Sequence, residues 1–212
     1  MQTHPEVKIL TILLLLCGSF SLPRPASPLA EFSPAWNETR FLKCNTAQNT
    51  SYLTAEEKEL IYIFNMMRLD PKLFAATVVK QFPKKRGPLY LENIPEYRSL
   101  LDTMSRLEPL PLLYPDKDLF ESARCHAISS GEKAYVGHVR QTEECHKKKN
   151  FHAECCDYGH QTPLEMLMGL LIDENVESLG HRYICLSSFN RIGVSIQPHK
   201  RYGKNVVLDF GW

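Results

Sequence analysis

Two short runs near the C-terminus, Ile192-Gly193-Val194-Ser195-Ile196 and Val206-Val207-Leu208-Asp209-Phe210, decide the fold. Both runs are rich in β-branched and aromatic side chains, which predicts two strands. Pro198 and Gly203 lie between them and indicate the turn of a hairpin. The segments that precede this hairpin have helical spacing. Helices followed by strands are typical of a layered α+β domain.

The folded domain is predicted to span residues 53–212. Thr54-Ala55-Glu56-Glu57 has the pattern of a capping box, which marks the start of a helix. Further helices are predicted over residues 72–81, 97–107, 118–135 and 164–172, where apolar side chains recur at helical spacing. Residues 137–161 lack this spacing and predict a long irregular loop, a kind of segment that compact domains keep for function.

The N-terminus has the features of an export signal. An apolar run over residues 9–17 follows Lys8 and gives way to small residues, which is typical of a secretory signal peptide over residues 1–21. The run is too short for a transmembrane helix. A secreted, extracellular protein is therefore expected, or alternatively a protein anchored to the cell surface by a lipid on Cys17. Residues 22–52 contain four prolines and no periodicity, which favours an extended arm or linker.

The composition excludes some classes of partner. The 212 residues include 25 Lys and Arg against 24 Asp and Glu, a formal net charge of +1. A near-neutral chain carries no electrostatic footprint for nucleic acid. The hydrophobic fraction of 43% argues against a disordered chain. We expect a single-domain monomer.

Six cysteines remain once the predicted signal is removed, and an even set in an exported chain favours disulfides. They are Cys44, Cys125, Cys145, Cys155, Cys156 and Cys185. Six cysteines allow 15 pairings, and the sequence does not choose among them. Cys155 and Cys156 are adjacent, and a bond between them would be strained. A bond from Cys145 to either of them would close a short loop.

Two Gly-His pairs are the strongest candidates for metal-binding or proton-transferring residues. His138 and His181 each follow a glycine, Glu154 lies in the loop after His138, and Asp173 ends the helix before His181. Imidazole nitrogens and carboxylate oxygens are ligands that Zn²⁺ accepts. The same four groups could instead handle protons. The remaining histidines are interpreted as packing or loop residues.

The order of these pieces resembles the CAP superfamily of cysteine-rich secretory, antigen 5 and pathogenesis-related 1 proteins, also called the SCP domain. Asn65-Met66-Met67-Arg68 is similar to the family's N-x-x-R helix. Val136-Gly137-His138 and Gly180-His181-Arg182 resemble its two histidine motifs, and Ala153-Glu154-Cys155 stands where the family has G-E-N. The predicted C-terminal hairpin is similar to the family's closing hairpin. The resemblance covers residues 53–212.

The resemblance implies a three-layer α-β-α sandwich with a large cleft. It also implies that a tetrad of two histidines and two acids lines the cleft and binds Zn²⁺ in some members. Carried over by position, the tetrad is His138, Glu154, Asp173 and His181, with Glu174 as the competing second acid. His138 and His181 would be the metal ligands. Asp173 is one methylene shorter than the family's glutamate, so its carboxylate reaches less far.

Three functions compete at this point. The first is a secreted binding module whose cleft holds a lipid, a peptide or a glycan, with any metal structural or modulatory. The second is a hydrolase, either Zn²⁺-dependent or acid–base, in which Glu154 activates a water. The third is a lipid-anchored protein that presents the domain to a partner. We favour the binding module, because the sequence pairs no Ser or Cys nucleophile with a base and a shared fold carries no general reaction.

Overall fold

The computed structural model describes residues 26–212. The predicted signal peptide over residues 1–21 and the predicted lipid site at Cys17 lie outside the described residues. The described chain is a single unit of mixed α and β structure around one sheet. The α+β class predicted from the sequence is therefore confirmed.

Helices make up most of the regular structure. The helical segments are η1 (Pro34–Asn37), η2 (Thr39–Cys44), α1 (Ala55–Leu69), α2 (Pro71–Phe74), η3 (Ala75–Val79), α3 (Lys80–Lys85), η4 (Leu89–Asn93), α4 (Pro95–Arg106), α5 (Lys117–Lys133), α6 (Glu143–Lys148), α7 (Pro163–Ile172) and α8 (Gly180–Cys185). The strands are β1 (Tyr114–Pro115), β2 (Ala153–Tyr158), β3 (Arg191–His199) and β4 (Gly203–Gly211). The capping box that starts α1 is present as predicted, with both of its hydrogen bonds.

The sheet is built on the predicted hairpin. Strands β3 and β4 pair antiparallel, β2 adds to β4 antiparallel, and the short β1 adds to β3 in parallel. The strand order is β1-β3-β4-β2, so β2 is an edge strand. This edge matters because β2 carries Glu154.

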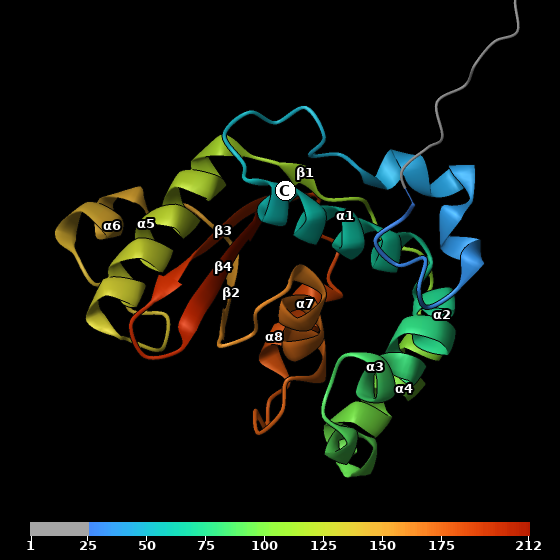
Figure 1. The fold of residues 1–212 in the computed structure, drawn as a ribbon. Coiled ribbons are helices and arrows are strands. Elements are labelled where there is room, and N and C mark those ends of the chain that lie inside the picture. The colour runs from blue at the N-terminus through green and yellow to red at the C-terminus, as the bar shows by residue number, and fades with distance from the viewer. Residues whose placement is uncertain (1–25) are drawn as a thin grey trace, which may run out of the picture.

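Helices cover both faces of the sheet. Helix α5 packs on β3 and β4 from one side, and α1, α7 and α8 lie on the other (Figure 1). The close approach of α5 depends on Gly193 in β3, where an added Cβ would lie 2.1 Å from the Leu119 carbonyl carbon and 2.2 Å from the Phe120 nitrogen. On the opposite face, Phe64 of α1 meets Phe210 of β4 edge to face at 6.0 Å.

The segment that we predicted as an extended arm packs against the domain from residue 29 onward. Trp36 is 1% exposed, its indole N–H donates to Thr77 Oγ1 at 3.0 Å, and its ring contacts Phe41. Leu29 and Phe32 are buried in the same core. The prediction missed this packing because the segment folds as short 3₁₀ turns, which give neither the helical nor the strand spacing of apolar residues.

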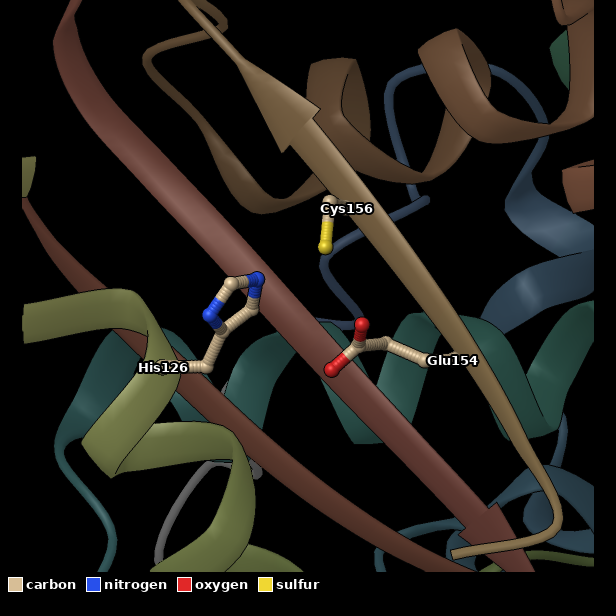
Figure 2. Close-up of side chains that lie close together, drawn as sticks. All are labelled: His126, Glu154 and Cys156. Atoms are coloured by element: carbon tan, nitrogen blue, oxygen red, sulfur yellow. The ribbon is translucent and has the colours of Figure 1, made fainter. Parts of the chain in front are cut away.

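The region predicted as a long irregular loop contains two regular elements, α6 and β2. Glu154 and Cys156 extend from the same face of β2 toward His126 of α5 (Figure 2). The strand was missed because a buried Glu154 and two adjacent cysteines, Cys155 and Cys156, do not alternate between apolar and polar. Glu154 therefore belongs to a strand of the sheet and not to a loop.

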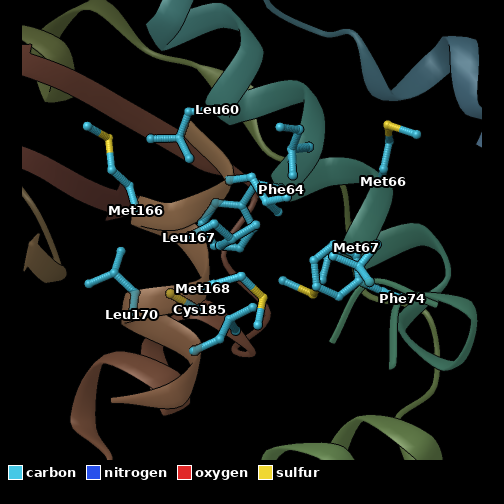
Figure 3. Close-up of a cluster of buried hydrophobic side chains, with 14 of the residues drawn as sticks. Leu60, Phe64, Met66, Met67, Phe74, Met166, Leu167, Met168, Leu170 and Cys185 are labelled. Carbon is cyan, nitrogen blue, oxygen red and sulfur yellow. The ribbon is translucent and has the colours of Figure 1, made fainter. Parts of the chain in front are cut away.

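The main core fills the space between α1 and α7. Leu60, Phe64 and Met67 from α1 face Met166, Leu167 and Leu170 from α7, and Cys185 of α8 lies among them (Figure 3). All of these side chains are buried. The packing fixes α7, which ends at the candidate site.

Two polar side chains of the N-x-x-R helix are buried and hold distant segments together. The Asn65 amide donates to the carbonyls of Cys44 and Leu113, and it accepts from the Leu113 N–H. The Arg68 guanidinium donates to the carbonyls of Pro111, Cys185 and Phe189. These two side chains stabilise the fold, because their partners are backbone groups from segments far apart in the sequence.

The cysteines pair differently from the expectation that all six form bridges. Cys125 of α5 and Cys145 of α6 form a disulfide. Cys44, Cys155, Cys156 and Cys185 are free and buried. Of the pairings that the sequence left open, a bond from Cys145 to Cys155 or Cys156 is not formed, because Cys145 already has Cys125 as its partner and β2 holds the other two within the sheet.

No helix among residues 26–212 has the length and apolar character needed to cross a membrane.

Candidate functional site

The first half of the site is His138, which follows α5. Its Nδ1 lies 2.9 Å from Glu154 Oε1, and its side chain is 54% exposed. Gly137 fixes the approach of this residue to the edge of the sheet, because its N–H donates to the Tyr158 hydroxyl and its carbonyl accepts from His126 Nε2. The φ of Gly137 is +127°, which a residue with a Cβ rarely adopts. The glycine of the first Gly-His pair thus has a conformational role.

Glu154 is held from behind by a buried charge network. Its side chain is 3% exposed, and its second oxygen accepts from Arg140 Nη1. Arg140 also reaches Asp209 Oδ2 at 3.4 Å and Ser122 Oγ at 3.2 Å. Asp209 faces Glu154 directly across the β2–β4 pair. The guanidinium therefore lies against two neighbouring buried carboxyl groups.

The two carboxyl groups of this network differ in pKa. Burial raises the pKa of Asp209, and the adjacent Glu154 carboxylate raises it further. Burial acts in the same direction on Glu154, but the hydrogen bond with His138 and the charge of Arg140 bring the Glu154 pKa below its ordinary value. Glu154 is accordingly the ionised member, which suits it to hold His138.

The second half of the site is His181 in the first turn of α8. Its Nδ1 lies 2.7 Å from Asp173 Oδ1, and its backbone N–H donates to Asp173 Oδ2 at 2.9 Å. Asp173 has left-handed backbone angles (φ 57°, ψ 46°) at the C-terminal cap of α7. This turn points the carboxylate at α8 and makes up for the shorter side chain. Both oxygens of Asp173 contact His181, so the sequence-based concern about its reach does not apply.

Arg182 holds α8 in this position. Its fully engaged guanidinium donates to the carbonyls of Leu171 and Ile172 at the end of α7, and to Ser99 Oγ and the Glu96 carbonyl of α4. The residue is 2% exposed. The residue that follows His181 is therefore an anchor for the helix that presents it.

Glu174, the competing second acid, points elsewhere. Its Oε2 accepts from the Tyr90 hydroxyl at 2.7 Å. Asp173 is thus the carboxylate that pairs with His181.

The structure brings the four predicted site residues together. The His138 and His181 rings lie 5.8 Å apart between centroids and are tilted by 38°. Each imidazole uses Nδ1 to bond a carboxylate, which leaves Nε2 with the lone pair in the neutral ring. Histidines that bind metals are almost always oriented in this way by an acceptor on the other nitrogen. In each pair Nε2 is therefore the nitrogen left to contact a cation.

A second group of possible metal ligands lies deeper. His126, Glu154 and Cys156 each place one ligand atom within 4.8 Å of the others, and all three are buried (Figure 2). His126 Nε2 already donates to the Gly137 carbonyl at 2.9 Å, and Arg140 brings a positive charge to Glu154. These contacts oppose a cation, so the group suits a metal less well than the paired imidazoles.

A cleft of about 550 Å³ adjoins the tetrad. His181 and Asp173 line it, together with the 156–161 segment, one face of α7 and residues 86–91. Phe82, Leu91 and Leu170 give the wall apolar surface. The cleft is large enough for a small ligand.

The chemistry of the free thiols does not suit a nucleophile. Burial raises the pKa of the Cys155 and Cys156 thiols well above the ordinary value, so both stay protonated at neutral pH. Glu154, the water-activating base of the hydrolase hypothesis, has both oxygens engaged and lies away from solvent. The described side chains offer binding groups more readily than reacting ones.

Sequence reasoning missed three polar residues of this region. Arg140 and Asp209 belong to the buried network, and His160, interpreted from the sequence as a loop residue, forms a bonded pair with Asp157 in the cleft. A signal was present only for Asp209, a lone charge within the apolar run of β4. Arg140 depends on contacts between distant segments, whereas Asp157 lies only three positions before His160.

No family model, curated protein or solved structure matches the chain.

Proposed function

We propose that the chain is an exported binding module of the CAP type, with a three-layer α-β-α sandwich, whose tetrad binds Zn²⁺ beside a cleft for a lipid, peptide or glycan. The observation that carries the proposal is the paired geometry of His138 on Glu154 and His181 on Asp173. Helices on both faces of the sheet and the order of the motifs support the family assignment. The Cys125–Cys145 disulfide supports export, because disulfides persist in oxidising compartments.

The two imidazoles are the proposed metal ligands, and the two acids orient them. Zn²⁺ accepts histidine nitrogen and completes a four-coordinate shell with water or ligand atoms. Two protein ligands leave several positions open, which suits a modulatory metal at the edge of a binding cleft. A hydrolase is less well supported, because Glu154 has no free oxygen for a water.

Calorimetry with Zn²⁺ tests this proposal directly. The wild-type protein is expected to bind one Zn²⁺, and the double variant His138→Ala/His181→Ala is expected to lose binding because both nitrogen ligands are gone. His146→Ala is the control, since His146 is exposed on α6 away from the tetrad. Equal Zn²⁺ binding by the double variant and the wild type would contradict the proposal.

The assignment of the second acid gives a sharper test. Asp173→Asn is expected to weaken Zn²⁺ binding by about 10- to 100-fold, the usual effect of losing the carboxylate behind a ligating histidine. Glu174→Gln is a matched control one residue away, whose partner is Tyr90. It should leave the Zn²⁺ affinity unchanged. The reverse ranking of the two variants would show that Glu174 is the tetrad acid.

A further inference from the structure

The segment that carries His138 has little packing of its own. It follows the end of α5 at Lys133 and has no regular structure before α6 begins. Val136 and Val139, on either side of the histidine, are 48% and 61% exposed, and the His138 side chain is 54% exposed. Apolar contacts therefore do not fix the position of this imidazole, and polar contacts must do so.

Tyr158, the last residue of β2, contacts the peptide group next to His138. Its hydroxyl accepts from the Gly137 N–H at 3.0 Å and donates to the Gly137 carbonyl at 3.3 Å. A phenol hydroxyl has one proton to donate and lone pairs to accept, so one side chain can make both bonds. The bonded carbonyl belongs to the peptide link between Gly137 and His138. The contact thus acts directly on the backbone of the histidine.

The ring of Tyr158 is held in place by its neighbours. It packs against a small apolar cluster from α5, β2 and β4, which consists of Ala123, Ala127, Cys156 and Val207. It also meets the His199 ring edge to face, with 5.4 Å between the centroids. Nδ1 of His199 accepts from two backbone N–H groups, so Nε2 carries the proton and donates to the Tyr135 carbonyl at 3.1 Å. The same group of rings therefore also fixes the chain two residues before Gly137.

A second anchor follows the histidine. Arg140 is 4% exposed and donates to Glu154, which lies on the same strand as Tyr158. Tyr158 before His138 and Arg140 after it thus tie the segment to β2 at two points. Because Glu154 is also the partner of the His138 ring, both anchors fix the imidazole relative to its own carboxylate.

We propose that Tyr158 is a positioning residue of the tetrad. Its hydroxyl fixes the peptide group between Gly137 and His138, and this keeps Nδ1 of the imidazole on the Glu154 carboxylate. Nε2 is then the nitrogen that remains for a cation. The inference rests on the proposed metal binding for this last step alone.

Tyr158 also connects this half of the tetrad with the cleft. Its side chain belongs to the cleft wall, as does His181 in the other half. The hydroxyl therefore gives His138 a fixed position relative to the cleft as well as to Glu154.

The second half of the tetrad does not depend on Tyr158. His181 lies in α8, and its contacts are with Asp173 at the end of α7. Arg182 ties the same helix to the carbonyls of α7. Removal of the Tyr158 hydroxyl should therefore affect one imidazole and spare the other, whereas a general loss of stability would affect both.

Histidine-ring NMR of the metal-free protein tests the inference with the variant Tyr158→Phe. Phenylalanine keeps the ring and its packing and removes only the hydroxyl. In the wild type at pH 8, long-range ¹H–¹⁵N spectra are expected to show the Nδ1–H form of both His138 and His181, because each Nδ1 faces a carboxylate. In Tyr158→Phe, His138 is expected to show a mixture of the two neutral ring forms, and His181 is expected to keep Nδ1–H.

Calorimetry with Zn²⁺ gives a second readout. Tyr158→Phe should bind Zn²⁺ about tenfold more weakly than the wild type, the lower end of the roughly 10- to 100-fold effect of losing a partner behind a metal ligand. Tyr202→Phe is the matched control, since it removes the hydroxyl of a neighbouring ring that lies 6.1 Å from that of Tyr158. It should match the wild type in both measurements.

The outcomes separate this inference from the proposed function. An unchanged His138 ring form in Tyr158→Phe, the same change at His181, or an equal effect of Tyr202→Phe would each overturn the positioning role. Equal Zn²⁺ affinity of Tyr158→Phe and a wild type that binds the metal would overturn it as well. Failure of the wild type to bind Zn²⁺ would contradict the tetrad proposal, and the ring forms in the metal-free protein would still decide the role of Tyr158.

Discussion

Gly193→Ala is expected to destabilise the protein by more than about 3 kcal/mol, a large fraction of the roughly 5–15 kcal/mol that keeps a typical domain folded. The new methyl group would lie within 2.4 Å of three backbone atoms of Leu119 and Phe120, which belong to α5. Backbone atoms cannot move aside by changing a rotamer, so α5 would have to separate from β3. Because α5 also leads into the segment that carries His138, the site would be lost with the packing.

The measurement is urea unfolding followed by circular dichroism, with Gly180→Ala as the control. Gly180 opens α8, and an added Cβ there meets only Ser178 Oγ at 3.4 Å. Its replacement by alanine should change the free energy of unfolding by less than about 1 kcal/mol. Comparable unfolding midpoints for Gly193→Ala and the wild type would mean that α5 does not approach β3 this closely.

Arg140→Met is expected to cost about 3–5 kcal/mol at pH 7, the usual effect of removing one partner from a buried ionic group. Methionine fills similar space, but it leaves Glu154 and Asp209 facing each other without a cation. The exposed pair of Arg191 and Asp116 gives a matched control. Arg191→Met should cost no more than about 1 kcal/mol.

The pH dependence has a definite sign. Asp209 has a raised pKa in the folded protein, so the stability that its protonation contributes is present at low pH and is lost as the pH rises through the folded-state value. Removal of Arg140 should raise the pKa of Asp209 further and should raise the pKa of Glu154 from its lowered value. The deficit of Arg140→Met relative to the wild type should therefore shrink from pH 7 to pH 5.

Urea unfolding at the two pH values checks this, and Asp209→Asn in the Arg140→Met background should restore part of the loss. A deficit that grows on acidification, or a double variant no more stable than Arg140→Met, would contradict a network in which Arg140 neutralises both carboxyl groups.

Local patterns made part of this fold predictable. The β3–β4 hairpin and the capping box of α1 depend on neighbours in sequence, and both lie where the sequence predicts them. The packing of Trp36 was not predictable, because 3₁₀ turns have no amphipathic period. The edge strand β2 was missed because Glu154 is buried only by virtue of Arg140, a residue from another segment.

The candidate site, like the fold, was predictable only in part. His138 and His181 stand out in the sequence through their glycines, and Glu154 and Asp173 through their order along the chain. The choice between Asp173 and Glu174 depends on the left-handed backbone turn at the end of α7. No side-chain pattern in the sequence predicts such a turn at an aspartate. His160 was not singled out from the sequence, although Asp157 lies only three positions before it. Gly169, which leaves room for the pair, becomes its neighbour only after β2 and α7 pack.

The disulfide between α5 and α6 has a consequence for how a cation would be captured. Cys125 and Cys145 are 20 positions apart and enclose His138 in a closed loop of chain. Tying the loop ends lowers its conformational entropy, so a cation first held by His181 would meet the second imidazole at a high effective concentration. Reduction of this disulfide by a thiol in the buffer would lower the effective concentration of the His138 imidazole without changing any metal-binding atom of the protein. The measured cation affinity would then depend on the redox state of the sample.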